Sequence, residues 1–168
     1  MFFTGKLENW WYKPVMDLAV DWHSALHDLI RLAIAYVLAL PVGWYREREA
    51  HGIGVRTFPL VAMASCGYVL LAGPSDHVDI QAQSRIIQGL VAGIGFIGGG
   101  AILKAGQNVH GTAAAASIWN TGVIGAAVAQ QRYILAETLS ILNLVALRVL
   151  LPWKMKLDAR ETEPGEPK

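Results

Sequence analysis

Long charge-poor stretches alternate along this chain with short segments that are rich in charge. Reading from one charged segment to the next defines five such stretches, at residues 26–45, 57–74, 86–104, 112–131 and 133–153. Each has about the 17 to 25 residues that a helix needs to cross a bilayer core. The stretches also lack the two-residue alternation of a barrel strand, and backbone groups in lipid must be paired. The pattern therefore predicts an all-α, polytopic membrane protein with five transmembrane helices.

The fifth stretch differs from the others because it carries two opposite charges, Glu137 and Arg148. On a helix these two positions lie within about 20° of one another. We expect this face to pack against neighbouring helices, which would hide both side chains from lipid.

The two ends of the chain differ from its middle. Charges interrupt any signal peptide in residues 1–25, and after Pro14 the apolar residues repeat at three- and four-residue steps. We expect an amphipathic helix there, lying on the outer membrane surface and leading into a transmembrane domain at residues 26–153. Residues 154–168 are charged and end in a segment with two prolines, which predicts a disordered cytoplasmic tail.

Composition agrees with a membrane class. Of the 168 residues, 54% are hydrophobic and only 16% are charged, whereas soluble domains usually contain about 25% charged residues. The net charge of +1 leaves no basic excess to neutralise the phosphates of a nucleic acid. We therefore expect membrane lipid, and no nucleic acid, among the partners.

Lysine and arginine gather on one side of the predicted membrane. They lie in the loop at residues 46–56, at the end of the third stretch and after the fifth. These residues are Arg46, Arg48, Arg56, Lys104, Lys154, Lys156 and Arg160. Because basic segments stay in the cytoplasm, we expect an inner-membrane protein with a periplasmic N-terminus and a cytoplasmic C-terminus.

Glycine is concentrated in the third stretch, at Gly89, Gly93, Gly95, Gly98, Gly99 and Gly100. A G-x-G-x-x-G match occurs there, but no acidic residue between Asp79 and Glu137 is available to bind the ribose of a dinucleotide. Four-residue spacings of small residues let helix backbones approach closely in lipid. Three consecutive glycines can instead unwind a helix and expose carbonyl groups. We favour helix packing and keep an unwound binding site as the alternative.

Few polar side chains lie inside the predicted spans. The amide of Asn120, near the middle of the fourth, needs a partner on another helix, either within the bundle or on another protein. Glu137 is the only acidic residue well inside a span. The charged loop either sets only the orientation or forms a docking surface. Its candidate residues are Arg46, Glu47, Arg48, Glu49 and Arg56.

Nothing in the sequence indicates catalysis, a metal site or a cofactor. The serines Ser65, Ser84 and Ser117 lack a neighbouring base and are expected to pack or to cap helices. His23 and His27 are four residues apart, but a zinc site usually needs three or four protein ligands. We therefore expect no catalytic residues, no bound metal and no cofactor.

The order of several short motifs resembles the MgtC/SapB family of bacterial inner-membrane proteins. The motifs are Gly43-Trp-Tyr-Arg46-Glu47-Arg48-Glu49, Gly54-Val-Arg56-Thr57, Ser84-Arg85, the glycine run, His110-Gly111 and Ala115-Ala116-Ser117-Ile-Trp119-Asn-Thr121. They cover about residues 30–130 in the family's order and spacing. Each motif alone is weak, but together they are specific.

The resemblance implies four or five spans and links to growth under magnesium limitation, to intracellular survival of pathogens and to restraint of the membrane ATP synthase. It adds Arg85 to the candidate contact residues. Some members carry a cytoplasmic domain after the last span, which we expect this chain to lack. The chain departs from the family where His110 replaces an arginine and where Gln88 lies one position early. If either position contacts a partner, this protein has diverged in what it binds.

Two functions fit these observations. The leading hypothesis is a non-enzymatic regulator, which contacts another inner-membrane protein such as ATP synthase in a magnesium, stress or virulence response. Asn120 would supply its intramembrane contact. The alternative is a homo-oligomeric transporter or channel for magnesium, in which copies of Glu137 gather around one axis. A membrane-embedded enzyme is the least supported possibility.

Overall fold

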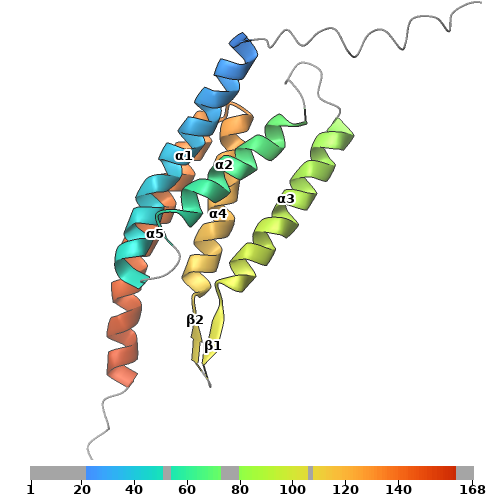
Figure 1. The fold of residues 1–168 in the computed structure, drawn as a ribbon. Helices are drawn as coiled ribbons and strands as arrows, with labels where there is room; N and C mark the ends of the chain where they lie inside the picture. Colours follow the sequence, from blue (N-terminus) through green and yellow to red (C-terminus); the bar gives the residue numbers. More distant parts are fainter. Residues whose placement is uncertain (1–21, 51–53, 73–79, 106–107, 162–168) are drawn as a thin grey trace, which may run out of the picture.

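Five helices and one short hairpin follow one another in the computed structural model, which describes residues 22–50, 54–72, 80–105 and 108–161. The helices are α1 (Trp22–Ala50), α2 (Thr57–Leu70), α3 (Ile80–Gly100), α4 (Thr112–Ala129) and α5 (Tyr133–Glu161). Each overlaps one predicted span, and successive helices run in opposite directions (Figure 1). The predicted all-α fold with five helices is therefore confirmed.

The last helix is longer than the sequence pattern predicted. We expected a disordered tail from residue 154, but α5 continues to Glu161. The segment from 154 to 161 contains no glycine or proline and consists mainly of good helix formers, so the helix has no local reason to end sooner. The rest of the expected tail and most of the expected N-terminal helix lie outside the described residues, while residues 22–25 belong to α1.

By length and composition alone, α1 and α4 are long and apolar enough to cross a membrane. The apolar helix α2 has only 14 residues, which corresponds to about 21 Å at 1.5 Å per residue. Polar or charged residues interrupt α3 and α5, for example Arg85 and Glu137. We infer that these three helices depend on the rest of the bundle for their place in the bilayer.

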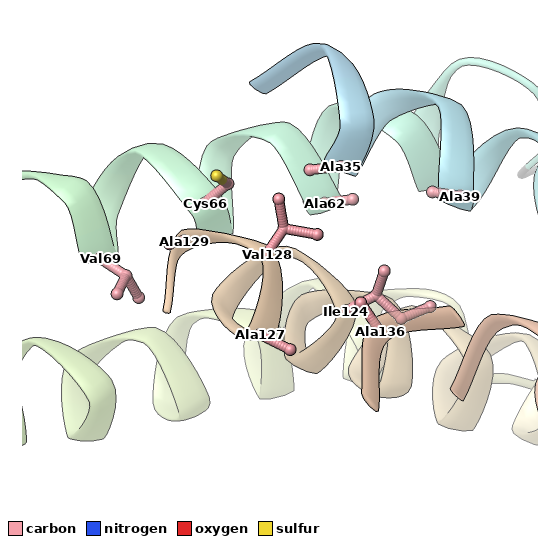
Figure 2. Packing of buried hydrophobic residues seen from close by; sticks show 10 residues of the cluster. All are labelled: Ala35, Ala39, Ala62, Cys66, Val69, Ile124, Ala127, Val128, Ala129 and Ala136. Carbon is pink, nitrogen blue, oxygen red and sulfur yellow. The ribbon is translucent and has the colours of Figure 1, made fainter. Parts of the chain in front are cut away.

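The centre of the bundle is α4, which contacts each of the other four helices. One buried cluster surrounds it with residues from α1, α2 and α5 (Figure 2). Its members are Ala35, Ala39, Ala62, Cys66, Val69, Ile124, Ala127, Val128, Ala129 and Ala136. Most are alanine, and small side chains let helices approach closely where lipid supplies no hydrophobic drive for association.

A second buried cluster fills the opposite half of the bundle, and it contains residues from all five helices. Its members are Val42, Phe58, Val61, Ile94, Ala101, Ala114, Ile118 and Leu147. Phe58 is its largest fully buried side chain. This half adjoins the helix ends that carry the charged loop, so the cluster positions the residues considered below.

A short antiparallel hairpin, which the sequence pattern did not predict, connects α3 to α4. It pairs β1 (Leu103–Ala105) with β2 (Asn108–His110), with Leu103 opposite His110. Gly111 follows with a φ of 85° and begins α4. A side chain there would collide with the carbonyl oxygen of Ala101, and a positive φ favours glycine. The family-like pair His110-Gly111 therefore forms a tight connection.

Candidate functional site

The charged loop motif builds the corner between α1 and α2. The Glu47 carboxylate accepts a hydrogen bond from the Val55 N–H at 3.1 Å. A Cβ atom at Gly43 would lie 3.1 Å from the carbonyl oxygen of Gly54, and a Cβ atom at Gly54 would collide with Glu47. Gly43 and Gly54 thus allow the backbone of α1 and the backbone before α2 to approach closely, and the hydrogen bond of Glu47 joins the two segments. These motif residues have a structural role within the chain.

The arginines of the same motif are not all on the surface. Arg48 and Arg56 are exposed, and the guanidinium of Arg48 lies over the Trp44 ring at 5.1 Å. Arg46, in contrast, is only 9% exposed. The expectation that Arg46 belongs to a cytoplasmic docking surface is therefore wrong, because its position on α1 turns it into the bundle. The side chain of Glu49 lies outside the described residues.

The two charges of α5 are not hidden by neighbouring helices. Glu137 and Arg148 are both exposed, which contradicts the prediction that their face packs inside the bundle. Arg148 lies over the ring of Tyr45 at 5.7 Å, and the Tyr45 hydroxyl donates to the carbonyl oxygen of Leu147 at 3.5 Å. The buried face of α5 carries Ser140 and Asn143 instead.

A buried polar network joins α4 to α5. The hydroxyl of Ser117 donates to Asn143 Oδ1 at 2.9 Å, and Asn143 Nδ2 donates back to the Ser117 carbonyl oxygen at 3.4 Å. Asn120 Nδ2 donates to the carbonyl oxygen of Leu139 at 3.2 Å. The Asn120 amide thus connects two helices of this chain, as the simpler of its two interpretations predicted.

The sequence interpretation missed two members of this polar face. Asn143 pairs with α4, and the Ser140 hydroxyl donates to the carbonyl oxygen of Leu38 on α1 at 2.6 Å. Their three-residue spacing places both on one side of α5, and that spacing is the signal that could have identified them. Glu137 and Arg148, by contrast, are exposed.

The glycine run is helical throughout, because α3 continues to Gly100. The unwound alternative is therefore not what the structure shows. Within the described chain only Gly98 of the six candidates makes a close approach, since its Cβ would lie 3.2 Å from the Ala115 carbonyl oxygen. A Cβ atom on any of the other five would meet no described atom within 4 Å. These open positions are Gly89, Gly93, Gly95, Gly99 and Gly100.

An apolar groove of about 740 Å³ lies between α2 and α3. Gly89 and Gly93 line it from α3, opposite Ala64 and Tyr68 of α2. Elsewhere on α3, Phe96 is 85% exposed. A smaller cavity of about 240 Å³ between α3, α4 and α5 includes Arg132 at its polar end. The groove is the larger surface that the bundle leaves uncovered.

The remaining candidates are scattered over the molecule. Arg85 is exposed near the start of α3, far along the helix from Gly100. His23 and His27 are exposed on α1. Among the residues that the structure describes, no group of three or more His, Cys, Asp or Glu side chains could hold a metal ion. The arrangement is suited to contacts between helices, and its open surface is the glycine face of α3.

Comparison with known proteins gives a consistent result. A family model described as the MgtC family matches residues 32–155. YhiD from Escherichia coli strain K12, provisionally named a magnesium transporter, is 34% identical over 128 residues, which cover 72% of this chain and 59% of YhiD. SrpB from Synechococcus elongatus is 37% identical over 110 residues, which cover 58% of this chain and 60% of SrpB.

MgtC from Brucella abortus is 34% identical over 108 residues, which cover 62% of this chain and 43% of that protein. The chain therefore spans about 60% or less of the length of each of these relatives. No solved structure matches the chain.

Proposed function

The chain belongs to the MgtC family, and we propose that it is a non-enzymatic inner-membrane regulator. In this proposal it binds another membrane protein through helix–helix contact during magnesium limitation or a related stress. The names of its relatives support the link to magnesium. ATP synthase, which the family resemblance implies, is one candidate for the partner.

The observation that carries this proposal is the open glycine face of α3. Gly89 and Gly93 are four residues apart, line the groove toward α2, and meet no described atom within 4 Å where a Cβ would stand. Helices associate in lipid mainly by close packing of their backbones, for which this spacing is suited. A helix of the partner can therefore approach the backbone of α3 closely at these two positions.

The six glycines of α3 lower the stability of this helix, and contact with a partner would offset that cost. Each glycine in a helix interior costs about 0.5–1 kcal/mol relative to alanine, and five of these six make no close contact inside the described chain. Contact with another helix would offset that cost. We assign the intramembrane contact to this face and not to Asn120, whose amide is already bonded to α5.

Photocrosslinking in intact membranes tests the proposal. A photocrosslinking amino acid replaces Ile97, which lines the groove and is half-exposed. We expect a crosslink to a second membrane protein, which mass spectrometry identifies after detergent purification. The crosslink should disappear in a Gly93→Leu variant, because the added side chain occupies the groove at a position where a Cβ atom meets no described atom.

The matched control is Ala146→Leu, a similar enlargement on the exposed face of α5. It should leave the crosslink and growth at low magnesium unchanged, whereas Gly93→Leu should impair both. Recovery of self-crosslinked copies alone, or a crosslink that survives Gly93→Leu, would contradict the regulator.

A second candidate function is a homo-oligomeric magnesium channel or transporter. The observation in its favour is the exposed carboxylate of Glu137 on α5, because copies arranged around one axis could face a common path. Protein in liposomes should then pass magnesium, and Glu137→Gln should reduce the flux at least tenfold. Absence of flux in the parent protein would remove this candidate.

A further inference from the structure

Arg46 is a buried arginine that has no counter-charge among the side chains that the structure describes. It is 9% exposed, and its Nε atom has no hydrogen-bond partner among the described residues. Its neighbour in the motif, Glu47, points to the α2 corner and accepts from the Val55 N–H. Arginine stays protonated in proteins, so the bundle holds a positive charge that no described carboxylate neutralises.

The position of Arg46 places that charge at the edge of the bilayer. It immediately follows the predicted first span, which ends at residue 45. Arg46 lies one helical turn after Val42, and both therefore lie on the same face of α1. Val42 packs in one cluster with Ala114 from the first turn of α4 and with Leu147 of α5. Arg46, with its buried Nε atom, therefore lies on the side of α1 that packs in this cluster.

The groups around this end of the bundle are mainly positive. Arg148 lies over the ring of Tyr45, the residue before Arg46. The N-terminus of α4, at the same end of the bundle (Figure 1), begins at Gly111 without a side-chain cap. A helix N-terminus carries unpaired N–H groups and a partial positive charge. Cations and such N–H groups together favour an oxyanion.

We propose that Arg46 is the centre of a binding site for a phosphate group, supplied by the headgroup of an anionic phospholipid or by free phosphate. The planar guanidinium binds phosphate through two parallel hydrogen bonds, and the site lies at the depth of lipid headgroups. Binding supplies the missing counter-charge and fixes the ends of α1, α4 and α5 relative to one another. The site is separate from the groove on α3, so it does not rest on the proposed partner contact.

Thermal unfolding in a maltoside detergent, which contains no phosphate, tests the site. Phosphatidylglycerol, diacylglycerol or sodium phosphate is added in parallel, with sodium chloride at matched ionic strength. At ligand concentrations about a hundredfold above Kd, the midpoint should rise by roughly 5 °C or more. Diacylglycerol, which has the chains without the phosphate, should give no rise. A rise with phosphatidylglycerol alone identifies lipid as the source, and an equal rise with sodium phosphate identifies the free ion.

Two variants separate this site from general charge effects. Arg46→Met removes the charge at similar length and should abolish the rise. Arg85→Met removes an exposed arginine near the start of α3 and should retain it. Arg46→Lys keeps the charge without the bidentate fork, and it should weaken binding about tenfold while still folding.

Some results would overturn the site without affecting the regulator proposal. The parent protein could show no rise with either phosphate source, as expected if a carboxylate of another protein neutralises Arg46. The rise could also be equal in Arg46→Met and Arg85→Met. If Arg46→Met does not fold, the Arg46→Lys variant is measured instead. The site is contradicted if phosphatidylglycerol raises the unfolding midpoint of Arg46→Lys as much as that of the parent protein and if diacylglycerol gives an equal rise.

Discussion

Both α3 and α4 contain glycines at helical spacing, but the two helices use them in opposite ways. In α4 a Cβ atom at Gly125 would collide with the backbone of Ala62, and one at Gly122 would collide with Ile94. In α3 a Cβ atom at Gly89 or Gly93 would meet nothing within 4 Å among the described residues. Glycine therefore allows close helix packing within the bundle at α4, whereas at Gly89 and Gly93 of α3 it leaves the helix surface uncovered.

The comparison shows that a glycine spacing identifies a surface but not what covers it. α4 lies at the centre and contacts all four other helices, whereas α3 lies at the edge and contacts mainly α4 (Figure 1). The two glycines of α4, Gly122 and Gly125, pack closely against neighbouring helices. The glycines of α3 other than Gly98 meet no described atom and are open to another molecule.

The largest effect is expected for Gly125→Ala on the closed helix. The new methyl group would meet the carbonyl oxygen of Ala62 and push α2 away from α4, so we expect a loss of about 2–3 kcal/mol in the free energy of unfolding. Reversible unfolding in mixed micelles measures it. An unchanged stability would mean that α2 and α4 do not pack this closely.

A smaller effect is expected for Asn143→Ala, which removes the hydrogen bonds between α5 and Ser117 of α4. Interhelical hydrogen bonds in membranes are worth about 0.6 kcal/mol on average and up to about 1.7, so we expect a loss of about 1 kcal/mol. Thr138→Ala serves as the control, because that exposed hydroxyl bonds only within α5, to Ile134. Equal losses in the two variants would argue against a buried network at α4.

The smallest effect, with the opposite sign, is expected for Gly93→Ala on the open helix. Alanine removes the helix cost of glycine and meets no described neighbour, so we expect a gain of about 0.5 kcal/mol. The same unfolding measurement in micelles checks it. A loss of stability instead would show that this face packs within the protein, and the comparison between α3 and α4 would fail.

Much of the fold could be predicted from the chain, but less of the site. Charge-poor stretches predicted all five helices, since spanning length and the need to pair backbone groups are local properties. The prediction of which face of α5 is buried was wrong. The charges of Glu137 and Arg148 indicated that their face packs inside the bundle, but both are exposed, and Ser140 and Asn143 are buried instead. The sequence alone does not tell which face of a helix is buried, because burial depends on the helices that pack against it.

The sequence by itself determined the membrane class, the five helices and the family motifs, because hydropathy and short-range backbone geometry depend on adjacent residues. Only the tertiary structure decided that Arg46 is buried while Arg48 and Arg56 are exposed, and that Gly89 and Gly93 of α3 are open while Gly122 and Gly125 of α4 are closed. Burial depends on which helices meet and at what distance. Those contacts join residues far apart in the chain, and a local sequence pattern does not predict them.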